Sequence, residues 1–326
     1  MKLSIVATLY KSENYIDSFV QRASSAAREL VGDDFEIILI DDGSPDNSLE
    51  VAINLTKGNP NLRVVELSRN FGHHKAMMSG LEHANGDLIF LIDSDLEEQP
   101  EWLISFARDM DEKNCDVVYG VQEKRKGGLF ERWSGKLFYL LFQNSSGVKI
   151  PSNMTVARLM SRDYVQALLL HEEKELFFAG ILALTGFKQE PHQVTKLSTS
   201  PTTYSLRLKL SQVINAITSY TNSPLYFIFY TGITITSFSF LWVLLLFVRW
   251  IFFHDIPSGW TSVIISIWVL GGISITFSGI IGIYLAKIFS ETKRRPNSIV
   301  RCEYGLKETV YTSNHSTSNK GQISEQ

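Results

Sequence analysis

Cysteine is scarce in this chain of 326 residues, which contains only Cys115 and Cys302. Two thiols so far apart argue against a disulfide framework and are typical of unpaired cysteines in a reducing compartment. An excess of charge of one sign is also missing, since the formal net charge is -3. We therefore expect no nucleic-acid partner. The first residues, MKLSIVATLY, lack a signal-peptide pattern because their apolar run is short.

Glycine-rich nucleotide-binding motifs are missing as well. No GxGxxG and no GxxxxGK[ST] follows any expected strand, which disfavours a dinucleotide-binding fold and a P-loop. The first 120 residues instead alternate short β-like runs with helical patterns, the clearest helical one running from Tyr15 to Leu30. This alternation predicts an α/β, doubly wound and mostly parallel sheet. The expected strands are Leu3–Thr8, Phe35–Ile40, Arg63–Leu67, Asp87–Ile92 and Asp116–Tyr119.

Acidic side chains stand where two of these strands end. Ligands of such sheets bind at the carboxyl ends of the strands. Asp93, Asp95 and Glu97 alternate onto one side of an extended stretch, and converging carboxylates repel unless a cation neutralises them. Oxygen ligands suit Mg²⁺ or Mn²⁺, so we expect a divalent metal site. The alternative is that Asp95 and Glu97 are N-terminal charges of a helix that starts near Pro100.

Long apolar runs come late in the chain. Leu225–Phe253 and Trp260–Ile288 each exceed the roughly 20 residues that cross a bilayer, and their only charges, Arg249 and Lys287, lie near an end. We expect two transmembrane helices joined by His254–Gly259, and the alternative is a pair of buried core helices. Because neither run has a central ionisable residue, a transport pathway is poorly supported.

Basic residues flank this hairpin on the side of the N-terminal domain. Arg207 and Lys209 precede it, and Lys293, Arg294 and Arg295 follow it. The positive-inside tendency therefore predicts that the N-terminal domain and the tail face the cytoplasm. The expected organisation is a domain over 1–203, an amphipathic juxtamembrane helix over 204–223, two spans within 224–290, and a tail over 291–326 whose end is disordered.

Several stretches of the sequence resemble family 2 glycosyltransferases with the GT-A fold. They are ILIDDGSPDNS (38–48), LSRNFGHHKAMMSGLEHANGD (67–87), LIDSDLEEQPEWL (91–103) and DVVYGVQEKRKG (116–127). Within the family, the chain is similar to the polyprenyl-phosphate sugar transferases, a subgroup that includes dolichol-phosphate mannose synthase and bactoprenol glucosyl transferases. The similarity continues through ARLMSRDYV (157–165), SYTNSPL (219–225) and KRRPNSIVR (293–301), so it covers nearly the whole chain.

The resemblance implies a role for particular residues. The nucleotide sugar would be bound by Thr8, Tyr10, Glu13, Asp41, Asp42, Asp93 and Ser94. The metal would be bound by Asp93 and Asp95 of a DxD motif and by Glu97, where relatives often place a glutamine ligand. The catalytic residues would be Asp95, Lys124, Arg125 and Arg158. The candidates for binding a lipid phosphate are Arg125, Lys126, Arg158 and Arg207.

The chain also departs from the pattern of these relatives. Val156 stands where they have a second Asp before the arginine, and Thr202-Thr203-Tyr204 replaces their S-K-Y. A lipid phosphate is already anionic, with a second pKa of about 6, so as an acceptor it needs positioning more than a base. Val156 is thus compatible with such an acceptor. Glu172, Glu173 and Glu175 include a candidate base for a hydroxyl acceptor, although a solvated helix face explains them as well.

Two amphipathic stretches suit a membrane interface. Lys124–Lys126 leads into an apolar stripe over Leu129–Leu141, and a second stripe covers Leu206–Ile217. Ordinary core-facing helices remain the alternative for both. The adjacent His73 and His74 are interpreted as part of the site wall or surface, because no third metal ligand is near them in sequence.

The expected activity is inverting transfer of a sugar from a nucleotide-diphosphate sugar to polyprenyl (undecaprenyl) phosphate at a bacterial-type cytoplasmic membrane. The product would serve the synthesis or modification of cell-surface polysaccharide. The donor is expected to be a UDP-sugar by family habit, with GDP as the alternative, and Mg²⁺ or Mn²⁺ is the expected cofactor. Membrane lipids and a second copy of the chain are further possible partners. Two other hypotheses stay open: transfer to a hydroxyl of a lipid-linked glycan, and a non-catalytic scaffold with a nucleotide-binding fold.

Overall fold

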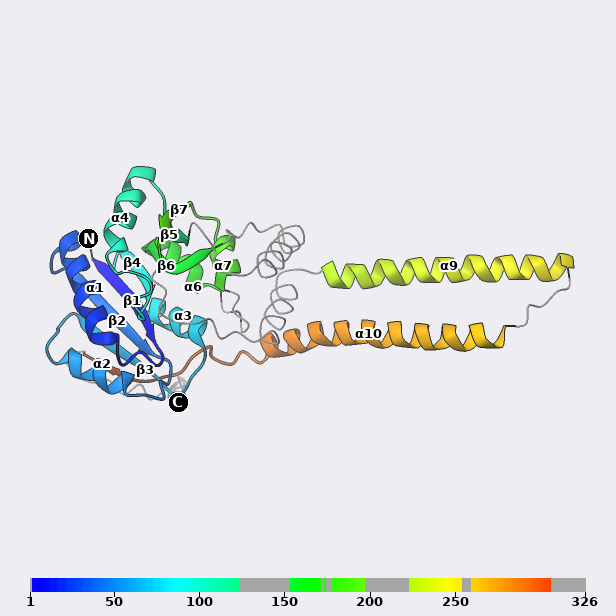
Figure 1. Ribbon diagram of the computed structural model, residues 1–326, viewed down its shortest axis with the longest axis horizontal. Coiled ribbons are helices and arrows are strands. Elements are labelled where there is room, and N and C mark those ends of the chain that lie inside the picture. The colour runs from blue at the N-terminus through cyan, green and yellow to red at the C-terminus, as the bar shows by residue number, and fades with distance from the viewer. Residues whose placement is uncertain are drawn as a thin grey trace, which may run out of the picture.

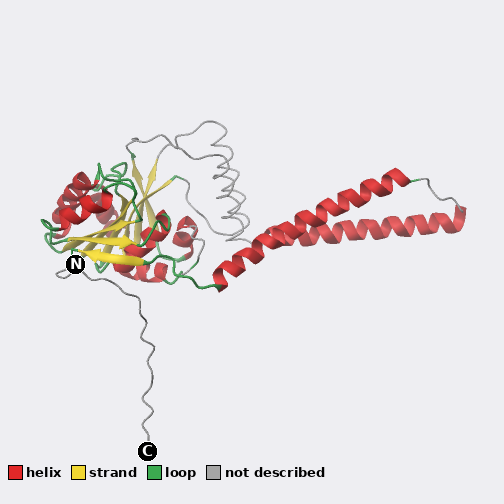
Figure 2. Cartoon of the chain, turned by 90° about the horizontal axis from the view of Figure 1, so that it is seen from below, coloured by secondary structure: helices red, strands yellow, loops and turns green. Residues whose placement is uncertain are grey.

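The protein consists of an α/β domain from which two long helices extend (Figures 1 and 2). The computed structural model describes residues 2–122, 153–171, 173, 178–196, 223–253 and 259–305. The segments expected to form the two amphipathic stretches, the end of the tail, and all but Gly259 of the connector between the apolar runs lie outside these residues.

An eight-stranded sheet forms the centre of the domain, in the order β7-β5-β6-β4-β1-β2-β3-β8. The strands are β1 (Leu3–Leu9), β2 (Phe35–Asp41), β3 (Leu62–Leu67), β4 (Leu88–Asp93), β5 (Val117–Gln122), β6 (Met154–Ser161), β7 (Gln189–Val194) and β8 (Val300–Tyr304). The five predicted strands are confirmed as β1 to β5. The sheet is mixed where the sequence predicted mostly parallel pairing, because β6 runs antiparallel between β4 and β5 and β8 runs antiparallel to β3.

Helices cover both faces of this sheet. One face packs against α1 (Ile16–Val31), α2 (Ser48–Thr56) and α4 (Trp102–Lys113), and the other against α3 (His73–His83), α6 (Arg162–Leu169) and α7 (Phe178–Leu184). Successive residues of the central strands alternate between these two cores: Ile5 belongs to the first and Val6 to the second. Burial on both faces explains why β1 and β2 are apolar almost throughout.

The two long helices are α9 (Ser223–Phe253) and α10 (Trp260–Thr292), which run side by side away from the sheet (Figure 1). Many of their large apolar side chains are exposed, Trp242 and Trp268 among them. In the part of the chain that the structure describes, one segment, Ser266–Thr292, is long and apolar enough to cross a membrane, and Pro224–Ile235 is a shorter apolar segment. One membrane-spanning candidate is thus shown, and the two-helix transmembrane hairpin stays a prediction.

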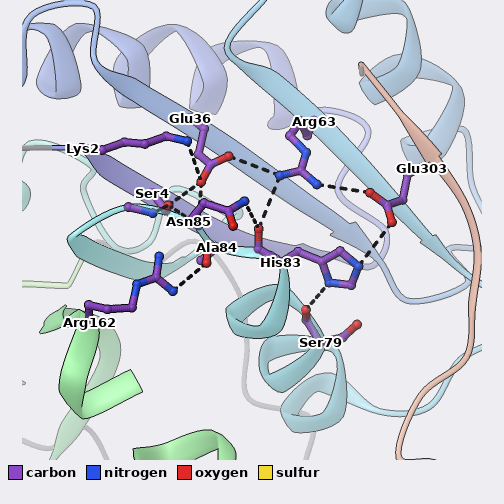
Figure 3. Close-up of polar contacts among 11 residues, drawn as sticks. Lys2, Ser4, Glu36, Arg63, Ser79, His83, Ala84, Asn85, Arg162 and Glu303 are labelled. Atoms are coloured by element: carbon purple, nitrogen blue, oxygen red, sulfur yellow. Dashed lines mark hydrogen bonds and ion pairs between the residues drawn. The ribbon is translucent and has the colours of Figure 1, made fainter. Parts of the chain in front are cut away.

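After α10 the chain returns to the domain as β8, which pairs with β3 at the sheet edge. A polar network reinforces this return (Figure 3). The Nη1 atom of Arg63 lies 3.3 Å from Glu36 Oε2, and its Nη2 atom lies 3.2 Å from Glu303 Oε2. Glu303 also lies 3.5 Å from Nε2 of His83. The segment that follows the long helices is therefore tied to the first strands of the domain.

Candidate functional site

The carboxyl ends of β1, β2 and β4 are neighbours. The pairing register aligns Thr8 with Asp93 and Leu9 with Asp41. The buried Ser94 hydroxyl crosses between strands, donating to the Thr8 carbonyl at 2.8 Å. The side chains predicted from separate parts of the sequence therefore meet at one edge of the sheet, as parallel strands require.

Asp93 has a buried oxygen that lacks a donor. Its Oδ1 atom accepts no hydrogen bond from the described residues, although Nε2 of His73 lies 3.3 Å away, at ion-pair distance. The other nitrogen of the ring, Nδ1, lies 3.1 Å from the Thr8 hydroxyl. Burial by itself opposes the charged imidazolium, but the adjacent carboxylate of Asp93 outweighs this effect and raises the pKa of His73. His73 therefore links the ends of β1 and β4 through Thr8 and Asp93.

A tight turn follows Asp93. Leu96 has a φ of 60°, in the left-handed region, and Asp95 Oδ1 accepts from the Glu97 amide at 2.9 Å. The chain therefore turns at residues 95–97, between the end of β4 and the start of α4. Burial, together with the neighbouring charge of Asp93, raises the pKa of Asp95 above its ordinary value. Carboxylates at this edge thus repel one another. We call the four of them, Asp93, Asp95, Glu97 and Glu98, the acidic rim.

Glu98 is fully buried in the acidic rim. It accepts hydrogen bonds from the amides of Val156 at 3.0 Å and Ala157 at 2.6 Å, which ties the rim to β6. Nζ of Lys196, just beyond β7, lies 3.4 Å from Glu98 and 3.3 Å from Glu97. Burial and the charge of Asp93 raise the pKa of Glu98 to about 7. Backbone amides of β6 and the side chain that follows β7 therefore both contact the acidic rim.

The predicted metal site is only partly assembled. Across the described ranges, no group of three or more His, Cys, Asp or Glu side chains is arranged to hold a metal ion. Asp93 and Asp95 nevertheless fit a hard divalent cation, because their donors are carboxylate oxygens and one of these is buried without a hydrogen bond. Glu97 is paired with Lys196, so its expected role as a third ligand stays a prediction.

The predicted nucleotide-binding residues divide into two groups. Tyr10 directly follows β1 and is half exposed, and Glu13 accepts from the Asn47 amide at 3.1 Å, so their expected contacts with the nucleotide stay a prediction. Asp41 and Asp42 are buried and already bound to backbone amides. Asp42 accepts from Phe71 at 2.7 Å and from Gly72 at 3.0 Å, and Asp41 accepts from Ser44. In this structure both therefore shape the loops around the site.

Arg158 is buried rather than displayed on the surface. Its Nε donates to the Val156 carbonyl at 2.9 Å, its Nη2 donates to the Thr155 carbonyl at 3.1 Å, and Phe178 covers the guanidinium at 5.3 Å. Burial lowers the pKa of this guanidinium. Its expected contact with a lipid phosphate stays a prediction. The other basic candidates, Lys124, Arg125, Lys126 and Arg207, lie outside the described residues, as do Thr202-Thr203-Tyr204.

Sequence analysis missed Lys196 and Glu98 as members of the site. Glu98 follows the DSD segment directly, so its position was a signal, but nothing local distinguishes it from the exposed Glu101. Lys196 lies about 100 residues further along the chain and has no motif of its own. Only the pairing of β7 with β5 and of β5 with β6 brings its ammonium to the acidic rim.

A comparison with protein families decides the family to which this chain belongs. The sequence profile of Glycosyl transferase family 2 matches residues 4–169, just over half of the chain. The chain belongs to this family. The match includes β1 to β6 and therefore every carboxylate of the acidic rim.

Relatives of this family 2 glycosyltransferase extend the similarity over the long helices. A Mycobacterium tuberculosis (strain CDC 1551 / Oshkosh) protein whose name places it among the glycosyltransferases is 46% identical over 94% of this chain and 89% of its own. A prophage bactoprenol glucosyl transferase homolog of Escherichia coli (strain K12) is 31% identical over 92% of this chain and 99% of its own.

Solved structures show a more distant likeness. Glucosyl-3-phosphoglycerate synthase from Mycobacterium tuberculosis, in complex with Mn²⁺, UDP and glucosyl-3-phosphoglycerate, has a TM-score of 0.46 and 20% identity, covering 68% of this chain and 80% of that chain. The mixed α/β sheet of this family 2 glycosyltransferase is consistent with the GT-A fold.

Proposed function

We propose that this glycosyltransferase moves a sugar from a nucleotide-diphosphate sugar to polyprenyl phosphate at the cytoplasmic face of a membrane. The acidic rim carries the proposal, because Asp93 and Asp95 place carboxylate oxygens, one of them buried without a donor, beside Thr8 at the end of β1. Relatives named as bactoprenol glucosyl transferases support a polyprenyl phosphate acceptor. UDP is the favoured nucleotide, with GDP as the alternative.

Asp93 and Asp95 would hold Mg²⁺ or Mn²⁺. The bound cation would offset the negative charge that develops on the departing nucleoside diphosphate. Asp42 and Ser94 keep the surrounding backbone in place through their hydrogen bonds to the 71–72 loop and to β1. Backbone held in this way lowers the cost of orienting the donor against these residues.

The acceptor oxygen would attack the anomeric carbon in line with the departing diphosphate, which inverts the configuration. A phosphate monoester is largely dianionic near neutral pH, so this attack requires orientation rather than proton removal. Val156 stands where the resemblance places a carboxylate, and the absence of a base at this position is compatible with a phosphate acceptor. Its side chain belongs to the partly buried margin of the second core.

The membrane would be spanned by both α9 and α10. The apolar surface of both helices and the candidate span Ser266–Thr292 support this arrangement. Lys293, Arg294 and Arg295 follow α10 directly, and their charges favour the cytoplasmic side. The α/β domain would then lie at the cytoplasmic face, with its donor site in reach of a lipid phosphate.

Membranes that contain the protein would be incubated with radiolabelled UDP-sugars or GDP-sugars and polyprenyl phosphate. We expect a labelled lipid that mild acid cleaves, because a sugar phosphodiester of an allylic lipid is acid-labile. The Asp95→Asn variant should form it at least roughly 100-fold more slowly. Release of a labelled monosaccharide by the acid would support the phosphate acceptor, whereas release of a labelled oligosaccharide would support transfer to a glycan hydroxyl. No product with any donor would contradict the proposal.

A further inference from the structure

Lys196 lies in a position that the proposed chemistry does not yet explain. Its Nζ atom is 3.3 Å from Glu97 Oε2 and 3.4 Å from Glu98 Oε1, and its side chain is 24% exposed. Glu98 in turn is fixed by two amides of β6. The ammonium is thus paired with a carboxylate that backbone amides hold in place, while part of the lysine side chain stays exposed to solvent.

The charge around this ammonium is strongly negative. Asp93 and Asp95 add their fields to those of Glu97 and Glu98, the two carboxylates that lie 3.3 Å and 3.4 Å from the Lys196 ammonium. A lysine ammonium is positively charged at neutral pH, so it offsets part of the repulsion within the acidic rim. A divalent cation that approaches Asp93 and Asp95 meets this positive charge, whereas a diphosphate that approaches the same edge is attracted by it.

We propose that Lys196 is the counter-ion of the acidic rim. Its charge lowers the affinity for a divalent cation that binds alone and raises the affinity for a nucleoside diphosphate. The inference rests on the proposed function, because it takes Asp93 and Asp95 as the cation site and the donor diphosphate as the anion. It makes cation and nucleotide bind best together, since the diphosphate offsets the repulsion between the cation and the ammonium. Glu97 and Glu98 then serve to hold Lys196.

Replacing Lys196 with Met tests both halves, because the two ligands should respond in opposite directions. A unit charge roughly 6 Å from a divalent ion changes its affinity about ten-fold even at the dielectric constant of water, about 80. We therefore expect Lys196→Met to bind Mn²⁺ alone about ten-fold more tightly, measured by electron paramagnetic resonance. The same variant should bind UDP in EDTA about ten-fold more weakly by calorimetry, with uridine binding unchanged.

Two control variants separate charge from structure. Lys196→Arg keeps the charge and should bind both ligands like the parent. Lys188→Met removes the same charge just before β7, at the opposite end of that strand, where the side chain bonds to carbonyls of Lys113 and Asn114, and should also match the parent. A purely structural role would weaken Mn²⁺, UDP and uridine together in Lys196→Met, and that result would overturn the inference.

Other outcomes also decide between the ideas. Unchanged Mn²⁺ and UDP affinities in Lys196→Met would refute the counter-ion role while leaving the proposed function standing. If the parent itself bound neither UDP nor GDP, with or without Mn²⁺, the proposed function would fail instead. A raised KM for polyprenyl phosphate with unchanged UDP binding would assign the ammonium to the phosphate of the acceptor and overturn its assignment to the donor.

Discussion

Replacing Arg63 with Met removes the cation that lies between Glu36 and Glu303 (Figure 3). The side chain of Arg63 is 17% exposed, that of Glu36 9% and that of Glu303 14%, so the network is largely shielded from water. Methionine is close to the aliphatic part of arginine in length and leaves little empty space. The main effect is therefore electrostatic, since two shielded carboxylates lose their common partner.

The cost of this change follows from what each carboxylate keeps. Removing one partner of a buried ion pair costs about 3–5 kcal/mol. Glu36 retains the Ser4 hydroxyl at 2.7 Å and the Asn85 amide at 2.8 Å, and Glu303 retains His83 at 3.5 Å. These partners reduce the expected loss in the free energy of unfolding to about 2–3 kcal/mol. For a domain of this size, that loss corresponds to a Tm about 5–10 °C lower.

Thermal unfolding in detergent, followed by intrinsic fluorescence, measures this loss. The matched control is Arg301→Met, which removes the same charge from β8, the strand paired with β3. The Arg301 side chain is 69% exposed and pairs with Glu66 at 3.2 Å, so its loss should cost no more than about 1 kcal/mol. Adding Glu303→Gln to Arg63→Met should recover part of the stability. Equal Tm values for the two single arginine variants would refute the reasoning.

Three further predictions concern pH, the loop around the site, and the metal. Burial alone would raise the pKa of Glu36, but its hydrogen bonds and the charges of Lys2 and Arg63 lower it. This group therefore adds stability above pH of about 4.5 that is lost as the pH falls through its lower folded pKa, and Arg63→Met should show a smaller loss in an acid titration of Tm. Gly43→Ala should lower the free energy of unfolding by about 2 kcal/mol or more and weaken nucleotide binding. The reason is that Gly43 has a φ of 63° and that a Cβ atom there would lie 2.6 Å from the Asn70 amide nitrogen. A parent-like Tm would contradict this. Asp95→Asn should lower turnover roughly 100-fold or more with an unchanged Tm, and a parent-like rate would remove the metal role.

Local patterns were enough for much of the α/β domain. The predicted stripe is buried along α1 from Ile16 to Ala27, with Tyr15 and Leu30 half-buried at its ends, and the five predicted strands exist with ends close to those expected. The strand pattern also predicted that acidic side chains stand at the carboxyl ends of the strands, and in the structure Asp93, at the end of β4, is aligned with Thr8 of β1. These features depend on hydrophobic periodicity and on strand order, both of which are written in neighbouring residues.

The amino-acid sequence by itself determined the central strands, the helices between them and the edge at which the acidic side chains gather. The tertiary structure alone decided the mixed sheet, the return of β8 after α10, and the partners of the site carboxylates. Phe71 and Gly72 reach Asp42 across a loop, and Lys196 reaches Glu98 only because β7, β5 and β6 are paired. Such contacts join residues far apart in the chain, and no short-range pattern of polarity encodes which amide or ammonium will arrive.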